Sequence, residues 1–471
     1  MIWLILLGSL IIRLVAINQS LWLDEAIGAE AVKNFSLWGL ITEFSKFDNH
    51  PSLYYLILKI WSTIFGYSEI SLRFPSIAFG VGTVYLTFLI ARQVFSKSRL
   101  FYLLAPILLA TSGLHVYYSQ EARMYSLATF LATLAVYAFI KSSWLLFSFS
   151  ITSLLMADYV GIFLLPVFWI WGIWKKKDSG WWKAFLATHL PLIVFGILWL
   201  PIFLIQSSHG KWLLETLPAW QSVAGGATFK QAGILWAKFV LGRISFQDKA
   251  FYYLLVGVAS IPALVGLFNA IRKRREVELI WLWLVVPLAS GFIASFVFPA
   301  FIYFRFMFTL PAFFILISWG VSGIKSKASK ILIIGLLVFS NLFGWFIYAK
   351  QANQQREHWK QAVEFIERVA NDKEIVVFEY PEPFTPWRWY SSGKVEAFGA
   401  TDEISADGLK TQERTKSLTK DVEGVYYFEY LRDLSDPERV IEKTLAEEGF
   451  SAKEIFDYFP GVGQVTHYVK D

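Results

Sequence analysis

Long apolar runs recur along this chain, the first at Ile2–Ile17 and the last at Ile331–Tyr348. Each run has about 17 to 22 residues, which as a helix is long enough to cross a hydrocarbon layer about 30 Å thick. We count about eleven such runs, and helices satisfy the backbone hydrogen bonds that lipid cannot satisfy. The composition agrees, since 56% of the residues are hydrophobic and only 17% are charged. The sequence therefore predicts a polytopic α-helical membrane protein.

Several classes of protein are excluded by what the sequence lacks. The first apolar run has no small-residue cleavage site after it, so we expect it to be a retained span rather than a signal peptide. The chain contains no Cys, which excludes disulfides, thiolate metal sites and a Cys nucleophile. It also has no Walker-type phosphate loop and no internal repeat.

Basic residues predict the orientation, because short loops rich in Lys and Arg stay on the cytoplasmic side of a membrane. Such residues occur in every second loop, at Arg92, Lys97 and Arg99, at Lys141, at Lys175 to Lys177, at Arg272 to Arg275, and at Lys325, Lys327 and Lys330. We therefore expect the N-terminus inside, and the loops at about 18–72 and 206–249 outside. The positive net charge belongs to cytoplasmic loops, so it predicts no nucleic-acid partner.

A separate domain is predicted at 351–471, after a membrane domain at 1–350. The apolar runs stop there, and acidic residues outnumber basic ones. The stretch "HWKQAVEFIERVA" has the period of an amphipathic helix, and "EIVVFEY" and "GVYYFEY" have the pattern of strands. We expect a small, soluble α/β domain on the extracytoplasmic side of the membrane. The aromatic residues of "PWRWY" (Pro386–Tyr390) fit either its hydrophobic core or a surface that packs against a sugar.

Two acidic residues follow directly after the first apolar run. In "LWLDEAIGAEAV", Asp24 and Glu25 open a helix that we expect to lie in the membrane interface within the first outer loop. Adjacent helical positions point about 100° apart, so only one of the two carboxylates can face a given site. Capping is the alternative role, because Asp and Glu are both favoured in a first helical turn.

The far end of the same loop carries a second polar group. In "FDNHPSLYYLILKIW", Asp48 and His50 precede Pro51, which we expect to start another interfacial helix with Tyr54, Tyr55 and Trp61 at headgroup depth. An acidic residue and a His at the mouth of a helical bundle can act as a base and the group that orients it. Capping by Asp48 or Asn49 is again the alternative.

Two arginines are out of place for the predicted topology. Arg123 in "YSQEARMYS" and Arg305 in "FIYFRFMFTLP" both lie where a span begins on the outer side. Arginine at a membrane boundary is costly and usually has a partner, and its planar fork suits a phosphate. A protein acid such as Glu121 or Asp158 could serve instead. Arg13 and Arg73 could play similar parts, although Arg13 is expected to be paired within the protein.

The order of these motifs resembles one known family. "LWLDEA", "DNHPSLYYLILKIW", "SEISLRFPSIAFGVGTVYLTFLIARQVF" and "YSQEARMYSL" are similar to bacterial members of glycosyltransferase family 39. These are membrane glycosyltransferases of the GT-C type, related to protein O-mannosyltransferases and to the lipid A aminoarabinose transferase. The match is specific over about the first 140 residues. Later stretches agree mainly in hydropathy, apart from Arg305 and "ADYVG", which contains Tyr159.

The resemblance implies a GT-C fold and an enzyme of the plasma membrane that uses a polyprenyl-phosphate-linked sugar at the outer face. It implies that Asp24, with Glu25 beside it, is the catalytic base. The Asp-x-His-Pro motif falls on Asp48, His50 and Pro51, with Ser52 in place of the usual second Pro. We expect Arg123, Arg305, Tyr125 and Tyr159 to bind the donor phosphate. The acceptor could be a lipid, a glycan or a protein, and transfer is expected to proceed with inversion.

Three questions stay open from the sequence. A divalent cation such as Mg²⁺ or Mn²⁺ could be bound by Asp24, Asp48 and His50, but no metal motif of fixed spacing is present. A lipid-linked sugar flippase or transporter without transferase chemistry is the alternative function, although transporters place polar residues nearer the midplane. The C-terminal domain is expected to cover the cavity mouth and to affect acceptor use more than donor binding.

Overall fold

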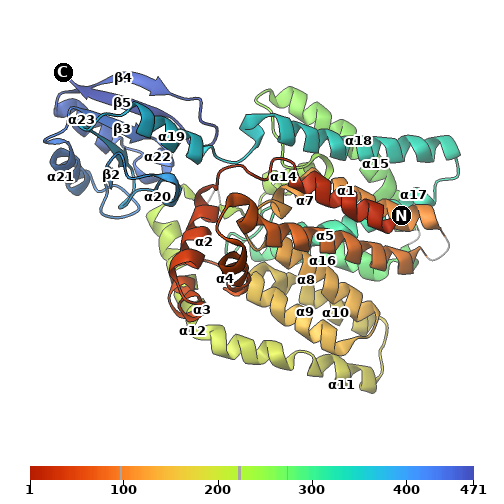
Figure 1. The fold of residues 1–471 in the computed structure, drawn as a ribbon. Helices are drawn as coiled ribbons and strands as arrows, with labels where there is room; N and C mark the ends of the chain where they lie inside the picture. Colours follow the sequence, from red (N-terminus) through yellow and green to blue (C-terminus); the bar gives the residue numbers. More distant parts are fainter. Residues whose placement is uncertain (96–97, 221–223, 273) are drawn as a thin grey trace. The chain divides into compact units, whose positions relative to one another are not determined.

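The computed structural model describes residues 1–95, 98–220, 224–272 and 274–471, which form two compact units (Figure 1). We call the first the helical unit; it comprises the described residues of Met1–Ile17, Phe35–Ser207 and Ala224–Gln354. The second, which we call the mixed unit, comprises Asn18–Asn34, the described residues of Ser208–Val223, and Gln355–Asp471. Lys97 and Lys273 of the predicted basic loops lie outside the described residues.

The helical unit consists of helices and short 3-10 turns. In chain order they are α1 (Ile2–Leu14), α3 (Leu37–Thr42), η1 (Phe44–Lys46), α4 (Leu53–Phe65), α5 (Glu69–Val94), α6 (Arg99–Thr111), α7 (Gly113–Ser119), α8 (Tyr125–Ile140), α9 (Trp144–Ala157), η2 (Tyr159–Leu164), α10 (Leu165–Trp174), α11 (Ser179–Ala187), most of α12 (Leu190–Thr216), α14 (Phe229–Leu241), α15 (Lys249–Arg272), η3 (Arg274–Glu276), α16 (Glu278–Ala294), η4 (Met307–Thr309), α17 (Leu310–Ser322), α18 (Lys327–Lys350) and η5 (Ala352–Gln354).

Among the described residues, four helical stretches are long and apolar enough to cross a membrane: α5, α11 with α12, α15 and α18. Helices α6 and α7 make a fifth if they are one span bent by 57°. Seven further apolar helices have 10–17 residues, and a helix of that length is shorter than the hydrocarbon layer. The helices make this a membrane protein, and the number of about eleven spans stays a prediction.

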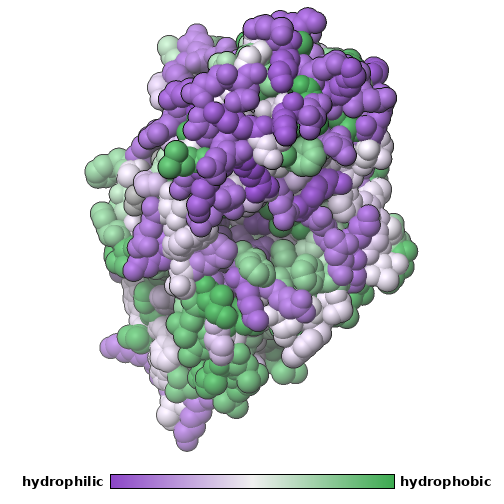
Figure 2. All heavy atoms as spheres, turned by 90° about the vertical axis from the view of Figure 1, so that its left-hand side faces the viewer, coloured by the Kyte–Doolittle hydropathy of each residue, from purple (hydrophilic) through white to green (hydrophobic). Residues whose placement is uncertain are grey.

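Apolar side chains are exposed in the way that helices against lipid require. Helix α12 exposes Ile193, Ile197 and Leu198, and α15 exposes Leu254 and Ile261. Figure 2 shows hydrophobic side chains (green) gathered on one part of the face it draws and hydrophilic ones (purple) on another. Contiguous apolar surface of this kind is rare on soluble monomers and marks contact with a membrane or a partner.

The mixed unit contains a five-stranded sheet in the order β2-β1-β3-β5-β4. Its strands are β1 (Glu374–Phe378), β2 (Ala397–Gly399), β3 (Gly424–Phe428), β4 (Phe450–Phe456) and β5 (Val465–Lys470). Strand β1 pairs in parallel with β2 and β3, whereas β5 is antiparallel to β3 and β4. The helices of this unit are α2 (Leu23–Asn34), α19 (Trp359–Val369), α20 (Thr385–Tyr390), α21 (Gly408–Thr419), α22 (Arg432–Ser435) and α23 (Val440–Glu447). The predicted helix and two strands are α19, β1 and β3.

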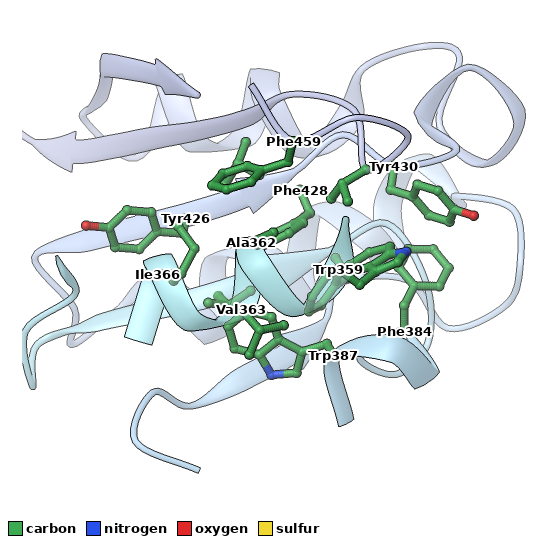
Figure 3. Close-up of a cluster of buried hydrophobic side chains, with 14 of the residues drawn as sticks. Trp359, Ala362, Val363, Ile366, Phe384, Trp387, Tyr426, Phe428, Tyr430 and Phe459 are labelled. Atoms are coloured by element: carbon green, nitrogen blue, oxygen red, sulfur yellow. The ribbon is translucent and has the colours of Figure 1, made fainter. Parts of the chain in front are cut away.

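Each face of the sheet is covered by helices, because alternate strand residues point to opposite faces. On one face, Trp359 and Ile366 of α19 pack with Phe378, Phe428 and Trp387 (Figure 3). On the other face, Ile375, Val377 and Tyr427 pack with residues of α23. Trp387 of the stretch "PWRWY" is only 2% exposed. It therefore belongs to the hydrophobic core and does not offer a surface to a sugar.

A buried carboxyl group follows the central strand β1. Glu379 is fully buried; its Oε2 accepts a hydrogen bond from Ser435 (3.3 Å), and its Oε1 has no hydrogen-bond partner among the described residues. Burial raises the pKa of Glu379 from 4.5 to about 9, and the neighbouring Asp436 carboxylate acts in the same direction. The folded protein therefore holds a proton on Glu379 that the unfolded chain releases.

We expect Glu379→Gln to stabilise the protein relative to the wild type as the pH rises. Between the unfolded pKa of 4.5 and the folded pKa of about 9, the wild type loses stability with rising pH, by at most about 1.4 kcal/mol per pH unit. Gln cannot ionise, so this loss is absent in the variant. Apparent Tm values of the full chain in detergent at pH 6 and pH 9, at one scan rate, check this. A Tm difference between the two proteins that does not change with pH would contradict it.

Two segments of the predicted membrane domain 1–350 belong to the mixed unit, Asn18–Asn34 and the described residues of Ser208–Val223. Asn18–Asn34, from the predicted first outer loop, belongs to the mixed unit together with the C-terminal residues. The boundary near residue 350 was placed where the apolar pattern ends, and the unit border lies between Gln354 and Gln355. Hydropathy reports the local environment of a segment and does not report which distant segment it packs against. For that reason this association could not be read from the sequence.

The helix after Pro51 also differs from its prediction. Helix α4 begins at Leu53, two residues after Pro51, with Ser52 as its N-cap residue. Tyr54 and Tyr55 are each 1% exposed, so they pack inside the protein and do not face lipid headgroups, and their depth in the membrane stays a prediction. Tyr54 Oη is 2.9 Å from Ser76 Oγ of α5. Both tyrosines have found polar partners inside the helical unit, which a buried hydroxyl needs.

Candidate active site

Asp48 and His50 form a closed local turn before α4. Asp48 Oδ1 accepts hydrogen bonds from the backbone N–H of His50 (2.9 Å) and from its Nδ1 (2.9 Å). A carboxylate that bonds the backbone two residues later forms an Asx-turn, which fixes the side chain to the loop. The other oxygen of Asp48 accepts a hydrogen bond from Tyr55 Oη of α4 (2.5 Å). Asp48 therefore orients His50 and does not cap α4.

Opposing influences act on the Asp48 carboxyl group. Burial alone would raise the pKa of Asp48, but the hydrogen bond from His50, the charges of His50 and Arg123, and the hydrogen bond from Tyr55 together hold the pKa well below its usual range. Asp48 is thus ionised at neutral pH. A carboxylate so firmly held is a poor proton acceptor, which suits an orienting role better than that of a base.

Arg123 is tied into the same group. Its Nη1 donates to Tyr55 Oη (2.9 Å) and lies 4.0 Å from Asp48 Oδ2, and its Nη2 is 3.4 Å from His50 Nδ1. The residue is only 5% exposed. The nearby acid is therefore Asp48, which the sequence did not indicate as its partner. We call Asp48, His50, Tyr55 and Arg123 the polar cluster. The assignment of Arg123 to a donor phosphate stays a prediction.

Tyr159 reaches the polar cluster through one further residue. Its hydroxyl donates to Gln206 Oε1 and accepts a hydrogen bond from Trp199 Nε1 (2.6 Å). Gln206 Nε2 in turn donates to the carbonyl oxygens of Ser45 (2.6 Å) and His50 (3.1 Å). Gln206 is 4% exposed. The chain of bonds links helix α12 to the turn that carries His50, so Tyr159 has a structural role here besides the predicted one.

Of the two boundary arginines, Arg305 is the more exposed and has fewer polar contacts among the described residues. It is partly exposed, and its Nη1 donates to the Pro299 carbonyl (3.2 Å). Among the described carboxylates none forms an ion pair with it. Tyr125 lies in an aromatic group nearby in the chain fold, with ring centroids 5.4 Å from Tyr118 and 5.1 Å from Phe304. Arg305 thus retains a guanidinium fork for an anion.

The remaining two arginines serve the packing of the helices. Arg13 is fully buried and donates from Nη1 to Ser9 Oγ (2.6 Å) and the Ala110 carbonyl (3.2 Å), while its Nη2 is 2.6 Å from His115 Nδ1. The prediction that Arg13 is paired within the protein is confirmed. Arg73 is 1% exposed and donates to the Ile17 carbonyl (2.7 Å).

Asp24 and Glu25 belong to the mixed unit, whereas the polar cluster belongs to the helical unit. Asp24 is partly exposed on the first turn of α2. Glu25 is fully buried, and its Oε2 lies 3.8 Å from Nε of the buried Arg356. The two neighbouring carboxylates therefore have different environments, as the geometry of a helix requires. Asp24 is the one that can meet a substrate.

We expect Glu25→Gln to destabilise the protein by about 3 to 5 kcal/mol, because it removes a buried negative charge that lies 3.8 Å from the buried Arg356 guanidinium. The apparent Tm of the full chain in detergent measures the loss. Glu30→Gln on the same helix is the matched control, since its ion pair with Arg388 is partly solvent-exposed and such pairs contribute at most about 1 kcal/mol. Equal effects of the two substitutions would contradict this account of Glu25.

Glu357 is the second charged residue that packs at the start of α2. Its Oε2 accepts hydrogen bonds from the backbone N–H of Leu23 (3.3 Å) and from Trp359 Nε1 (2.8 Å), and its Oε1 accepts one from Tyr430 Oη (2.9 Å). Burial raises the pKa of Glu357 to about 7, and the charge of Asp24 adds to this effect against those three hydrogen bonds. A carboxylate at a helix N-terminus also satisfies an N–H group that has no partner within the helix.

The metal prediction gains no support from the geometry. Asp24 lies in a different unit from Asp48 and His50, and the described residues contain no group of three or more His, Asp or Glu side chains that could hold an ion. Binding of a divalent cation by Asp24, Asp48 and His50 stays a prediction, and no step of the reaction is assigned to a metal.

Four residues of the two sites were not indicated by the sequence: Tyr55, Gln206, Arg356 and Glu357. The sequence predicts only that each lies in a helix, a membrane span or a linker. The pair "RE" at Arg356 and Glu357 does stand out as two charges directly after the last apolar run. Charged residues at such a junction are common, however, so the signal alone is weak.

The described helices and the mixed unit together define a membrane protein with the GT-C fold of membrane glycosyltransferases. The chain is similar to the crystal structure of ArnT from Cupriavidus metallidurans in the apo state, with a TM-score of 0.57 and 10% identity over 99% of this chain and 97% of that chain. It is similar to the same protein bound to undecaprenyl phosphate, with a TM-score of 0.60, 11% identity and the same coverage. The predicted resemblance is confirmed at the level of the fold.

Comparison by sequence, unlike comparison by structure, does not identify related proteins. No protein-family model matches the chain, and no curated protein matches it by sequence. At about one residue in ten identical, the two structures share a backbone arrangement whose side chains have largely changed. The fold is therefore known, and the reaction has to be argued from the residues.

Proposed function

We propose that this protein is a membrane glycosyltransferase that moves a sugar from a polyprenyl-phosphate-linked donor to an acceptor hydroxyl at the outer face of the plasma membrane. The observation that carries the proposal is the likeness over nearly the whole chain to a structure that holds undecaprenyl phosphate. The separation of one partly exposed carboxylate, Asp24, from a set of buried and paired charges adds to it.

In the proposed reaction, Asp24 removes the proton of the acceptor hydroxyl. The acceptor oxygen then forms a bond to the anomeric carbon, and the bond from that carbon to the phosphate oxygen breaks with inversion. The electron pair leaves on the lipid phosphate, which is already stable as an anion and needs no general acid. Arg305 stabilises the charge that develops on that phosphate. Arg123 contributes to this as well, within the limits set by its hydrogen bonds inside the protein.

The polar cluster has a supporting role in this scheme. Asp48 holds His50 by two hydrogen bonds and Tyr55 by a third, so the turn before α4 presents a fixed surface. Interactions fixed in this way cost no reorganisation when charge develops in the transition state.

A transporter of lipid-linked sugars is the second candidate, and one observation favours it. Helices α6 and α7 form a span bent by 57°, with the buried pair of Arg13 and His115 beside the bend. Broken helices with polar residues at membrane depth are typical of transporters. Purified protein in liposomes, given a panel of labelled undecaprenyl-phosphate hexoses and pentoses with an envelope extract as acceptor, separates the two. Release of free undecaprenyl phosphate supports transfer, whereas movement of intact donor between leaflets supports transport.

The orientation can be tested sharply because the chain contains no Cys. We expect a single Cys at the exposed Leu409 of α21 (Leu409→Cys) to react with an impermeant maleimide on intact cells. The matched control is Lys176→Cys in a loop that the basic residues predict to be cytoplasmic, and it should react only after the cells are opened. The opposite pattern would overturn both the topology and the outer-face active site.

A further inference from the structure

The residues just before Asp24 form hydrogen bonds with the C-terminal residues of the mixed unit. Ser20 Oγ donates to the Glu357 carbonyl (2.6 Å), and the backbone N–H of Leu21 donates to Tyr390 Oη (2.7 Å). The backbone N–H of Arg356 donates to Gln19 Oε1 (2.9 Å). The residues before Asp24 therefore have little freedom of their own, and the C-terminal residues decide where α2 begins.

Glu357 is the residue on which these contacts converge. Its side chain bonds the first residue of α2, and it is held from the other side by Trp359 and Tyr430, whose rings lie 5.0 Å apart in the core (Figure 3). A third element closes over it, because a Cβ on Gly461 would lie 2.7 Å from Glu357 Cγ. Gly461 has φ +79°, which also favours glycine. The Glu357 carboxylate is therefore fixed on three sides.

The charges around Glu357 make its position relevant to Asp24. Asp24 on α2 and Tyr430 after β3 are the titratable groups that face it. Arg356, its neighbour, is directed to Glu25, and the loop from Pro460 to Gly463 brings no charged residue. An ionised Glu357 is also the stronger acceptor for the backbone N–H of Leu23, because hydrogen bonds to a charged carboxylate are stronger than those to a neutral carboxyl group.

We propose that Glu357 is a positioning residue for Asp24, which fixes the start of α2 and does so best when its carboxylate is ionised and accepts the hydrogen bonds of Leu23, Trp359 and Tyr430. The inference rests on the proposed function, in which Asp24 is the base. The C-terminal domain, which contains Glu357, then contributes to the transfer step itself. This differs from the expectation that the domain acts on acceptor use, and the two can be told apart by a separation of kcat from KM.

Glu357→Gln is the first test, with transfer measured between pH 5.5 and 9 on undecaprenyl-phosphate sugar and an acceptor that the wild type uses. The wild-type kcat should rise with pH through about 7, where Glu357 ionises, and this rise should be absent in the variant. The variant kcat at pH 8 should fall on the order of 10-fold to 100-fold, with both KM values within about twofold of the wild type. A variant with the wild-type pH profile would overturn the inference.

Tyr430→Phe is the second test and keeps the inference falsifiable if Glu357→Gln does not fold. It removes one hydrogen bond that lowers the pKa of Glu357, so the rise in kcat should move to higher pH while the plateau is kept. A shift to lower pH, or no shift, would count against the inference. Glu30→Gln on α2 is the control and should leave the profile unchanged. A wild type that transfers no sugar at any pH would instead refute the proposed function, and the inference with it.

Discussion

Asp24→Asn is expected to lower sugar transfer by at least 100-fold, because a positioned general base contributes about 10² to 10⁴ in rate. Asn keeps the size of the side chain and its hydrogen bonding but cannot accept the proton of the acceptor hydroxyl. Asp24 is partly exposed on the first turn of α2, so its neutral analogue should change the stability by only about 1 kcal/mol. Initial rates of free undecaprenyl phosphate release, at matched protein levels, measure the effect.

The control for Asp24 is another acid at a helix start. Asp248 is exposed, and its Oδ1 accepts a hydrogen bond from the backbone N–H of Phe251 in the first turn of α15 (3.1 Å). Asp248→Asn should therefore cost a similar amount of stability, about 1 kcal/mol, without loss of transfer. If Asp24→Asn keeps most of its activity, Asp24 is not the base. If both variants lose activity together, the loss reports folding and not chemistry.

Arg305→Lys is expected to weaken the binding of undecaprenyl phosphate by about 10-fold, which corresponds to about 1.4 kcal/mol. Lys keeps the positive charge but loses the planar fork that holds two phosphate oxygens at once. The Arg305 guanidinium is partly exposed and forms no ion pair with a described carboxylate. Native mass spectrometry or microscale thermophoresis of the full chain with undecaprenyl phosphate gives the affinity, and Arg272→Lys, in a predicted cytoplasmic loop, is the control.

Arg123→Lys should behave differently from Arg305→Lys. Arg123 shares Tyr55 and Asp48 with the polar cluster, so its replacement should lower the apparent Tm as well as the affinity for the donor lipid. A loss of affinity in Arg123→Lys alone, with Arg305→Lys binding like the wild type, would assign the phosphate to Arg123 and contradict our ranking. Unchanged binding in both variants would assign both residues to packing.

Local sequence patterns predicted much of the fold. The apolar runs predicted the membrane class, and the period of "HWKQAVEFIERVA" and the strands around "EIVVFEY" predicted α19 and β1. Both depend on near-neighbour physics: the length of a helix in lipid and the burial of one helical or strand face. The burial of Tyr54 and Tyr55 inside the protein was not predicted, because an amphipathic helix with aromatics has the same sequence pattern whether its face meets lipid or protein.

In the candidate sites, too, contacts between near neighbours could be predicted, whereas contacts between distant residues could not. Asp48 and His50 bond each other across two residues, a contact that an Asp-x-His spacing suggests by itself. Their partners lie further along the chain, Tyr55 on α4 and Arg123 in the segment between α7 and α8, and no local pattern indicates how close they come to Asp48. Glu25 and Asp24 are adjacent in the sequence, yet one is fully buried near Arg356 and the other is partly exposed. Nothing in the local pattern distinguishes them.

By itself, the sequence determined that this chain is a helical membrane protein with acidic residues after its first apolar run and an α/β domain at its end. The tertiary structure decided that residues 18–34 belong with that domain, and that Glu357 bonds the first residue of the helix that carries Asp24. The physical reason is the range of the forces involved. Hydropathy and helical period are properties of neighbouring residues, whereas the contact of residue 23 with residue 357 depends on which buried surfaces fit together after the chain has folded.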